Sequence, residues 1–315
     1  MKGFPGIRVG VAVLLVALMR FGACDTLAAG SKKIALVQVN QQALFFTQMN
    51  NGAQAAARSE GIVLTIFNSN NDPVAQNNAI ETYIQQKVDA ILVDAIDVNG
   101  IKPAIREARK AGIPVVAIDA IINGDNDVQV GVDNRKVAEN IGRFTASYVA
   151  GKLGGCAQIG VLGALNSYVQ NVRLDGFKAG LAGETKAKIV ATVDGQNVQD
   201  RAQAAGENLI AGNPNLQLIY ATGEPALIGA IAAVGAQEAG DRVKIVGWDL
   251  SAQAIKGLDD GSVIAVVQQD PEDEGRTAVE AALKLIQHKP VDKLIAGSAI
   301  IVTEANLGKF RATYR

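Results

Sequence analysis

Two aspartates occupy matching places in two similar stretches of the chain. Asp119 ends the segment P-V-V-A-I-D, and Asp249 ends V-K-I-V-G-W-D. Each follows a short aliphatic run that predicts a buried parallel strand, and open α/β sheets bind ligands at the carboxyl ends of such strands. Ionised carboxylates only accept hydrogen bonds, so the pair suits a ligand rich in hydroxyl donors. The same pair could act as acid and base in a glycosidase, or each aspartate could belong to a turn.

Two adjacent phenylalanines follow the first predicted strand. Phe46 begins an apolar helical stripe that continues through Met49, Ala53 and Ala57. We therefore expect Phe46 to pack inward, while Phe45 stays at the carboxyl end of the strand and faces a ligand. A flat apolar ring beside the amides of residues 40–42 predicts a surface for a molecule with C–H faces and hydroxyl edges.

The composition argues against several other kinds of chemistry. With 30 basic and 31 acidic residues, the chain has no positive field for nucleic acid. His288 is the only histidine of the sequence, and Cys156 is expected to be a buried, inert thiol. Neither a metal site nor a cofactor is therefore expected. The segment 151–155 precedes its predicted strand and lacks the ending of a phosphate-binding loop.

Short aliphatic runs alternate with helical stretches in two successive series, a pattern typical of parallel sheets covered by helices. A chain of 315 residues favours two domains. We therefore expect an α/β protein with two Rossmann-like lobes. The expected strands are 34–39, 63–68, 90–93, 115–118 and 128–132, then 157–162, 188–193, 216–220, 244–247, 263–267 and 299–302. The expected helices are 46–60, 74–87, 100–111, 171–183, 198–211, 225–239, 251–260 and 272–287.

The N-terminus is typical of an export signal, with basic residues flanking an apolar core at 9–19. This core is too short to span a bilayer, which needs about 20 residues. We expect residues 1–29 to be a signal peptide and the protein to be periplasmic, with lipid attachment at Cys24 as the less favoured alternative.

The last segment continues neither lobe simply, which predicts several chain crossings that together form a multi-strand hinge. The first lobe is expected to comprise 30–133 plus 270–297, and the second 134–269 plus 298–315.

Several motifs together resemble a known family, the periplasmic solute-binding proteins of ribose-type sugar ABC transporters, and the resemblance covers nearly all of residues 32–305. It implies the type I periplasmic binding protein fold, hinge closure on one sugar and delivery to a membrane permease. The motifs are the F-F pair, the two strand-end aspartates, V-R-L-D-G-F at 172–177, N-P-N-L-Q-L-I-Y-A-T at 213–222, V-G-W-D at 246–249 and Q-Q-D-P at 268–271.

The resemblance also implies roles for individual residues. Phe45 and Phe46 match the pair that stacks on the sugar ring, Asp119 and Asp249 match two carboxylates that accept hydroxyl hydrogen bonds, and Gln269 matches an amide on the hinge side. Ala120 and Asn171 stand where ribose binders of the family have arginines, which predicts a ligand other than ribose.

Further contacts are expected near matching positions of the family. Asn197 lies near a position that is usually aromatic, and Gln42 lies close enough to replace a polar contact. Tyr168 follows a strand of the second series and is a secondary contact. Arg173, in contrast, is expected to be a structural residue on the lobe surface.

These observations predict an exported, non-catalytic receptor for a small neutral sugar or polyol, which serves the permease of an ABC importer, with a chemoreceptor as a further candidate partner. Two carboxylates with few basic residues to neutralise them disfavour an anionic ligand, whereas a cationic ligand stays an alternative. The alternatives are a carboxylate-pair glycosidase and the effector-binding module of a LacI-type regulator, which predicts an N-terminal helix-turn-helix where a signal peptide is expected here.

Overall fold

The structure is a computed structural model that describes residues 1–3, 31–183 and 186–314, and Ser31–Arg315 forms one compact unit. The predicted signal peptide beyond its first three residues, including Cys24, lies outside the described residues. Cleavage and lipid attachment therefore stay predictions. Among the described residues, no helix combines the length and the apolar character that a bilayer span requires.

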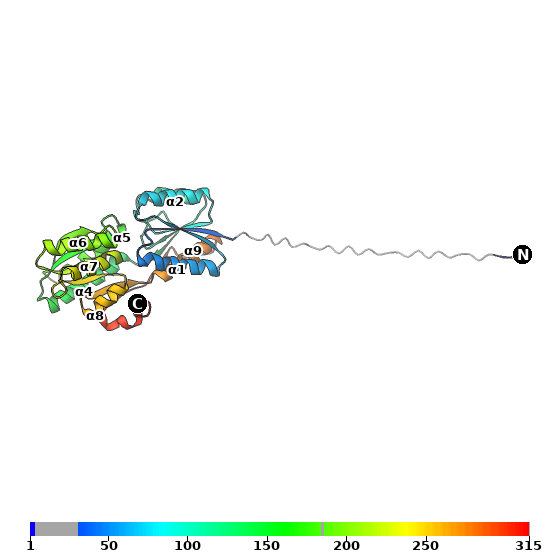
Figure 1. The fold of residues 1–315 in the computed structure, drawn as a ribbon. Helices are drawn as coiled ribbons and strands as arrows, with labels where there is room; N and C mark the ends of the chain where they lie inside the picture. The colour runs from blue at the N-terminus through cyan, green and yellow to red at the C-terminus, as the bar shows by residue number, and fades with distance from the viewer. Residues whose placement is uncertain (4–30, 184–185, 315) are drawn as a thin grey trace. The chain divides into compact units, whose positions relative to one another are not determined.

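The first of two six-stranded sheets has the order β11-β5-β4-β3-β1-β2, and all of its neighbouring strands are parallel. Ile34 and Leu36 pack with α1 and α9, while Ala35 and Val37 pack with α2 and α3 on the other face. Figure 1 shows α2 on one side of this sheet and α1 and α9 on the other. We call this sheet and these helices the first lobe. Its elements are β1 (Lys33–Gln38), α1 (Leu44–Ser59), β2 (Val63–Asn68), α2 (Pro73–Gln85), β3 (Ala90–Val93), α3 (Lys102–Lys110), β4 (Val115–Ile118), β5 (Val128–Gly131), α9 (Pro271–Ile286) and β11 (Leu294–Ala296).

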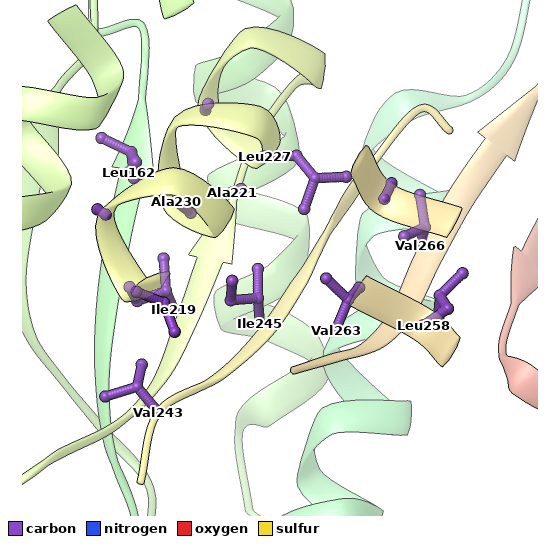
Figure 2. Packing of buried hydrophobic residues seen from close by; sticks show 14 of the residues in the cluster. Leu162, Ile219, Ala221, Leu227, Ala230, Val243, Ile245, Leu258, Val263 and Val266 are labelled. Carbon is purple, nitrogen blue, oxygen red and sulfur yellow. The ribbon is translucent and has the colours of Figure 1, made fainter. Parts of the chain in front are cut away.

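The second sheet has the order β12-β10-β9-β8-β6-β7, and only its edge strand β12 is antiparallel. One face packs on α4 and α5, and the other on α6, α7 and α8. Figure 2 shows Leu227 and Ala230 among Ile219 and Ile245 in this second core. We call this sheet and its helices the second lobe. Its elements are α4 (Asn134–Lys152), β6 (Gln158–Gly163), α5 (Tyr168–Leu181), β7 (Lys188–Asp194), α6 (Gln199–Gly212), β8 (Leu216–Ala221), α7 (Glu224–Ala236), β9 (Lys244–Trp248), α8 (Ala252–Asp260), β10 (Val263–Gln269), β12 (Ala299–Val302) and the 3-10 helix η1 (Glu304–Phe310).

The chain crosses between the two sheets more than once. It leaves the first sheet after β5, returns after β10 to form α9 and β11, and rejoins the second sheet at β12. The two-sheet α/β fold predicted from the sequence is confirmed, and each predicted strand lies within two residues of its expected ends. The exact lobe boundaries stay a prediction.

Two elements were not predicted from the sequence, and one expectation was wrong. The helix α4 was not predicted, although its buried residues Ala138, Ile141, Thr145 and Val149 recur at helical spacing. The short strand β11 was also missed, because three residues are too few for a periodicity to show. Cys156 is exposed rather than buried.

Two glycines allow α1 and α9 to pack in close contact. A Cβ atom on Gly52 would overlap the carbonyl oxygen of Glu272, and one on Gly275 would overlap the carbonyl oxygen of Met49. Both obstacles are backbone atoms, so a larger side chain cannot be accommodated by a rotamer change.

We predict that Gly275→Ala lowers the free energy of unfolding by about 1–3 kcal/mol, the usual cost of overpacking. Urea denaturation of the purified protein measures it. Gly235→Ala is the matched control, because Gly235 lies in α7 with open space around it and alanine is the better helix former. Equal or greater stability of Gly275→Ala would show that the two helices are not in close contact.

Candidate functional site

A cavity of about 600 Å³, counted out to its mouth, lies between side chains of both lobes. Its lining combines aromatic rings, carboxyl groups and amides, to which the first lobe contributes Phe45, Phe46, Asn71, Asp94 and Asp119, and the second Gln170, Arg173, Asn197, Glu224 and Asp249.

The two strand-end aspartates share one backbone geometry. Asp119 follows β4 with φ 52°, and Asp249 follows β9 with φ 65°. The amide of each donates to the neighbouring strand, Asp119 to the carbonyl of Val130 at 2.9 Å and Asp249 to that of Val267 at 2.7 Å. Left-handed backbone is uncommon for residues with a Cβ, and Asp tolerates it better than most. The repeated turn brings both carboxyl groups to the same cavity.

Arg173 lies between the two carboxylates. One guanidinium nitrogen is 3.9 Å from Asp119 Oδ2 and another is 3.8 Å from Asp249 Oδ2. The group also lies 3.8 Å from the centroid of the Trp248 ring. Because Arg173 is 4% exposed, its expected place on the lobe surface is wrong. It sits on the buried face of α5, and it links an acid of the first lobe to an acid of the second.

Amide groups hold this charged triad in place. Asn134 Nδ2 donates to Asp119 Oδ1 at 2.6 Å, while Arg173 Nε donates to Asn134 Oδ1 at 2.7 Å. Gln269 Nε2 donates to Asp249 Oδ1 at 2.9 Å. Gln269 does not line the cavity itself, so the structure places this predicted contact residue behind Asp249.

Both phenylalanines line the cavity, but their expected orientations are reversed. Phe45 is 5% exposed and packs with Met49 in the core of the first lobe, whereas Phe46 is only half-buried. The reason is that α1 begins at Leu44, which places Phe45 on the buried stripe. The two rings meet edge to face at a centroid distance of 5.2 Å.

The remaining predicted contacts divide between the cavity and its surroundings. Asn197 lines the cavity; it accepts from Gln170 Nε2 at 2.9 Å and donates to Asn71 Oδ1 at 3.1 Å across the lobes. Gln42 lines a neighbouring pocket instead. Tyr168 lines a separate pocket beside α4 and α5.

Asn171 was predicted to contact the ligand, but the structure gives it a different role. It does not line the cavity, and its side chain donates to the carbonyl of Leu165 at 2.9 Å. A short residue at this place therefore fixes the loop before α5.

Two cavity carboxyls were not predicted. Asp94 follows β3 directly and is 1% exposed, and Glu224 opens α7 and is 7% exposed. The rule that singled out Asp119, an acid directly after a buried strand, applies equally to Asp94. Glu224 Oε2 accepts from the amide of Leu44 at 2.8 Å and so meets the first turn of α1 from the opposite lobe.

Burial governs the protonation of these carboxyls. It raises the pKa of Asp249 to about 6, although Arg173 and then Gln269 lower it. It raises the pKa of Glu224 to about 7, against the lowering effect of the Leu44 amide. Burial and then the neighbouring Asp119 also raise the pKa of Asp94. The cavity therefore has more acid groups than its single guanidinium balances.

The fold and this interlobe cavity define a two-lobed α/β binding protein. Residues 34–290 match the family model described as periplasmic binding protein domain, and the chain belongs to that family. The predicted resemblance to the ribose-type sugar-binding branch is confirmed by curated relatives. The ribose import binding protein RbsB of Bacillus subtilis is 28% identical over 281 residues, covering 88% of this chain and 90% of its own. The D-ribose/D-allose-binding protein of Pseudomonas aeruginosa is 29% identical over 304 residues, covering 91% and 93%.

Solved structures are similar over the same length. A solute-binding protein of an ABC transporter from Mycobacterium smegmatis with bound glycerol has a TM-score of 0.82 at 27% identity, covering 89% of this chain and 97% of its own. Another from Agrobacterium vitis with bound D-fucose has a TM-score of 0.82 at 25% identity, covering 89% and 98%. These relatives are named as binding proteins, so they support the non-enzymatic function and give no support to the glycosidase or regulator alternatives.

We predict that Arg173→Met lowers the free energy of unfolding by about 3–5 kcal/mol, because two buried carboxylates lose their shared cation. Chemical denaturation at neutral pH measures the change. Arg106→Met is the matched control: Arg106 pairs with Asp125 at 3.3 Å on the surface, and such pairs contribute at most about 1 kcal/mol. Equal effects of the two substitutions would contradict a central role for Arg173.

Glu224 predicts a specific pH dependence of stability. Its pKa is about 7 in the folded protein against an ordinary value of 4.5, so the folded state holds a proton that the unfolded chain has already released between these two pH values. The stability from this proton is complete below pH 4.5 and is lost as the pH rises through 7. Glu224→Gln mimics the protonated acid and lacks this loss.

The wild-type protein should therefore match Glu224→Gln near pH 4.5 and be less stable by on the order of 3 kcal/mol near pH 7.5. Thermal or chemical unfolding of both proteins across this range measures the difference. A difference that does not change with pH would refute the raised pKa.

Proposed function

We propose that this protein is the exported substrate-binding component of an ABC importer, which captures a small sugar or polyol between its lobes and delivers it to a membrane permease. The observation that carries the proposal is the presence of Asp119 and Asp249, one from each lobe, in a single cavity with two phenylalanines. The family and the names of the relatives support it.

The chemistry of the lining matches a polyhydroxylated ligand. Carboxylates accept from hydroxyl groups, while amides such as Asn71 and Asn197 both donate and accept. The rings of Phe45 and Phe46 offer apolar faces for C–H groups. A buried polar group left unpaired costs about 1–3 kcal/mol, which would favour one stereoisomer over another. The surplus of carboxyl groups disfavours anionic ligands such as sugar acids and phosphates. A neutral sugar carries no charge that these groups would repel.

Hinge closure is the proposed mode of capture. The two lobes meet around the cavity through a small set of hydrogen bonds, among them Leu44 to Glu224 and Asn197 to Asn71. Asn40 Nδ2 also donates to the carbonyl of Asn197 at 3.4 Å. A ligand that bonds to both lobes would add to these contacts and stabilise the closed form.

Export and further partners belong to the same proposal. The sequence of residues 1–29 supports secretion to the periplasm, where the relatives' family operates. The permease is the proposed membrane partner, and a chemoreceptor is a second partner that the loaded form would serve.

We predict that calorimetry against pentoses, hexoses and polyols finds a ligand, and that Asp119→Asn and Asp249→Asn each weaken its binding about ten- to a hundred-fold. Phe45→Ala should also weaken binding, because it removes a wall of the cavity. Cys156→Ser is the control, since Cys156 is exposed and does not line the cavity. Silence of the wild-type protein across the whole panel would refute the proposal.

A further inference from the structure

The cavity has an uncompensated excess of acid. Asp94, Asp119, Glu224 and Asp249 line it, and Arg173 is the one basic residue in the described lining. Arg173 lies between Asp119 and Asp249 and is held there by further bonds to Asn134 and to the carbonyl of Thr222. The positive charge of Arg173 is therefore shared by the two strand-end aspartates.

Neither of the other two carboxyls has a salt bridge with a cation among the described residues. Glu224 accepts from the Leu44 amide, and the negative charge of Asp249 adds to the effect of burial in raising its pKa. Asp119 and Glu274 act on Asp94 as negative charges, and Arg173, which already pairs with the two strand-end aspartates, is the cation that acts on it within the described part of the chain. Each lobe thus contributes one cavity acid whose charged neighbour is mainly another acid rather than a base.

Asp94 provides the observation that points to a ligand. Its side chain is 1% exposed and lines the cavity, yet its Oδ2 atom has no hydrogen-bond partner. A buried carboxylate oxygen without a partner is costly, and a charge-assisted hydrogen bond is the strongest way to satisfy it.

The chemistry of the lining selects the kind of cation. Among the described residues, no group of three or more His, Cys, Asp or Glu side chains is arranged to hold a metal ion. Phe45 and Phe46 add ring faces, which attract organic cations as well as C–H groups. An ammonium group on a hydroxylated skeleton would bond to Asp94 and still use the amides and the strand-end aspartates.

We propose that the ligand of this cavity is an amino sugar or amino polyol, whose protonated amine is bound by Asp94 and attracted by Glu224. The inference rests on the proposed function and narrows its ligand class from sugars in general to cationic ones. An N-acetylated or neutral counterpart would lack the charge and leave Asp94 Oδ2 with a weaker partner.

Matched sets of ligands test this directly by calorimetry at neutral pH. Each set contains an amine, its hydroxyl counterpart and, for the sugars, its N-acetyl counterpart: glucosamine with glucose, galactosamine with galactose, mannosamine with mannose, and glucamine with sorbitol. We expect the tightest ligand of the panel to be an amine that binds at least about ten-fold more tightly than its counterparts. This is the gain in affinity expected when a charge-assisted hydrogen bond replaces a neutral one.

Variants assign the preference to a residue. Asp94→Asn should reduce the amine preference to less than about three-fold. Asp97→Asn is the control, because it removes a carboxylate from the same loop at an exposed position. Glu224→Gln should weaken amine binding by a smaller factor, and it provides a second test if Asp94→Asn unfolds.

Three outcomes would overturn the inference. A neutral sugar that binds more tightly than its amine would refute it and leave the proposed function standing. An amine preference that survives in Asp94→Asn would refute the assigned role of Asp94. Failure of every member of the panel to bind would count against both the inference and the proposed function.

Discussion

The buried guanidinium of Arg173, shared between Asp119 and Asp249, is the interaction on which the site depends. It belongs to the second lobe and reaches an acid of each lobe, at 3.9 and 3.8 Å. A buried ion pair contributes little net stability, but its geometry has to be satisfied because an unpaired charge in the interior is very costly. The triad therefore fixes how the carboxyl ends of β4 and β9 face each other, and with them the walls of the cavity.

Several features of the fold hold Arg173, Asp119 and Asp249 in place. Trp248 packs against the guanidinium, and its Nε1 donates to the Tyr220 hydroxyl at 2.8 Å, so the flat side of the arginine rests on a fully buried aromatic layer. Asn134, at the start of α4, bonds to both Arg173 and Asp119. The crossing between the lobes after β5 therefore leads directly into the charged site.

Much of the fold and part of the site were predictable from local patterns. The strands and the aspartates after them are local features, since a buried run and a following acid can be recognised in a few residues. The position of Arg173 was not recognised because an arginine is normally exposed. Its spacing from Gln170 and Phe177 does place it on the buried face of α5. Which of Phe45 and Phe46 turns inward depends on where α1 begins, and the periodicity fits both.

Identification of the molecule that the protein carries would test the central claim most directly. The protein purified from its native cell should release, on denaturation, one polyhydroxylated compound in stoichiometric amount by mass spectrometry, and the Asp119→Asn, Asp249→Asn double variant should release none. Release of the same compound by the double variant, or of an anionic or purely apolar compound by the wild-type protein, would contradict the conclusion that the paired aspartates of the two lobes grip the ligand.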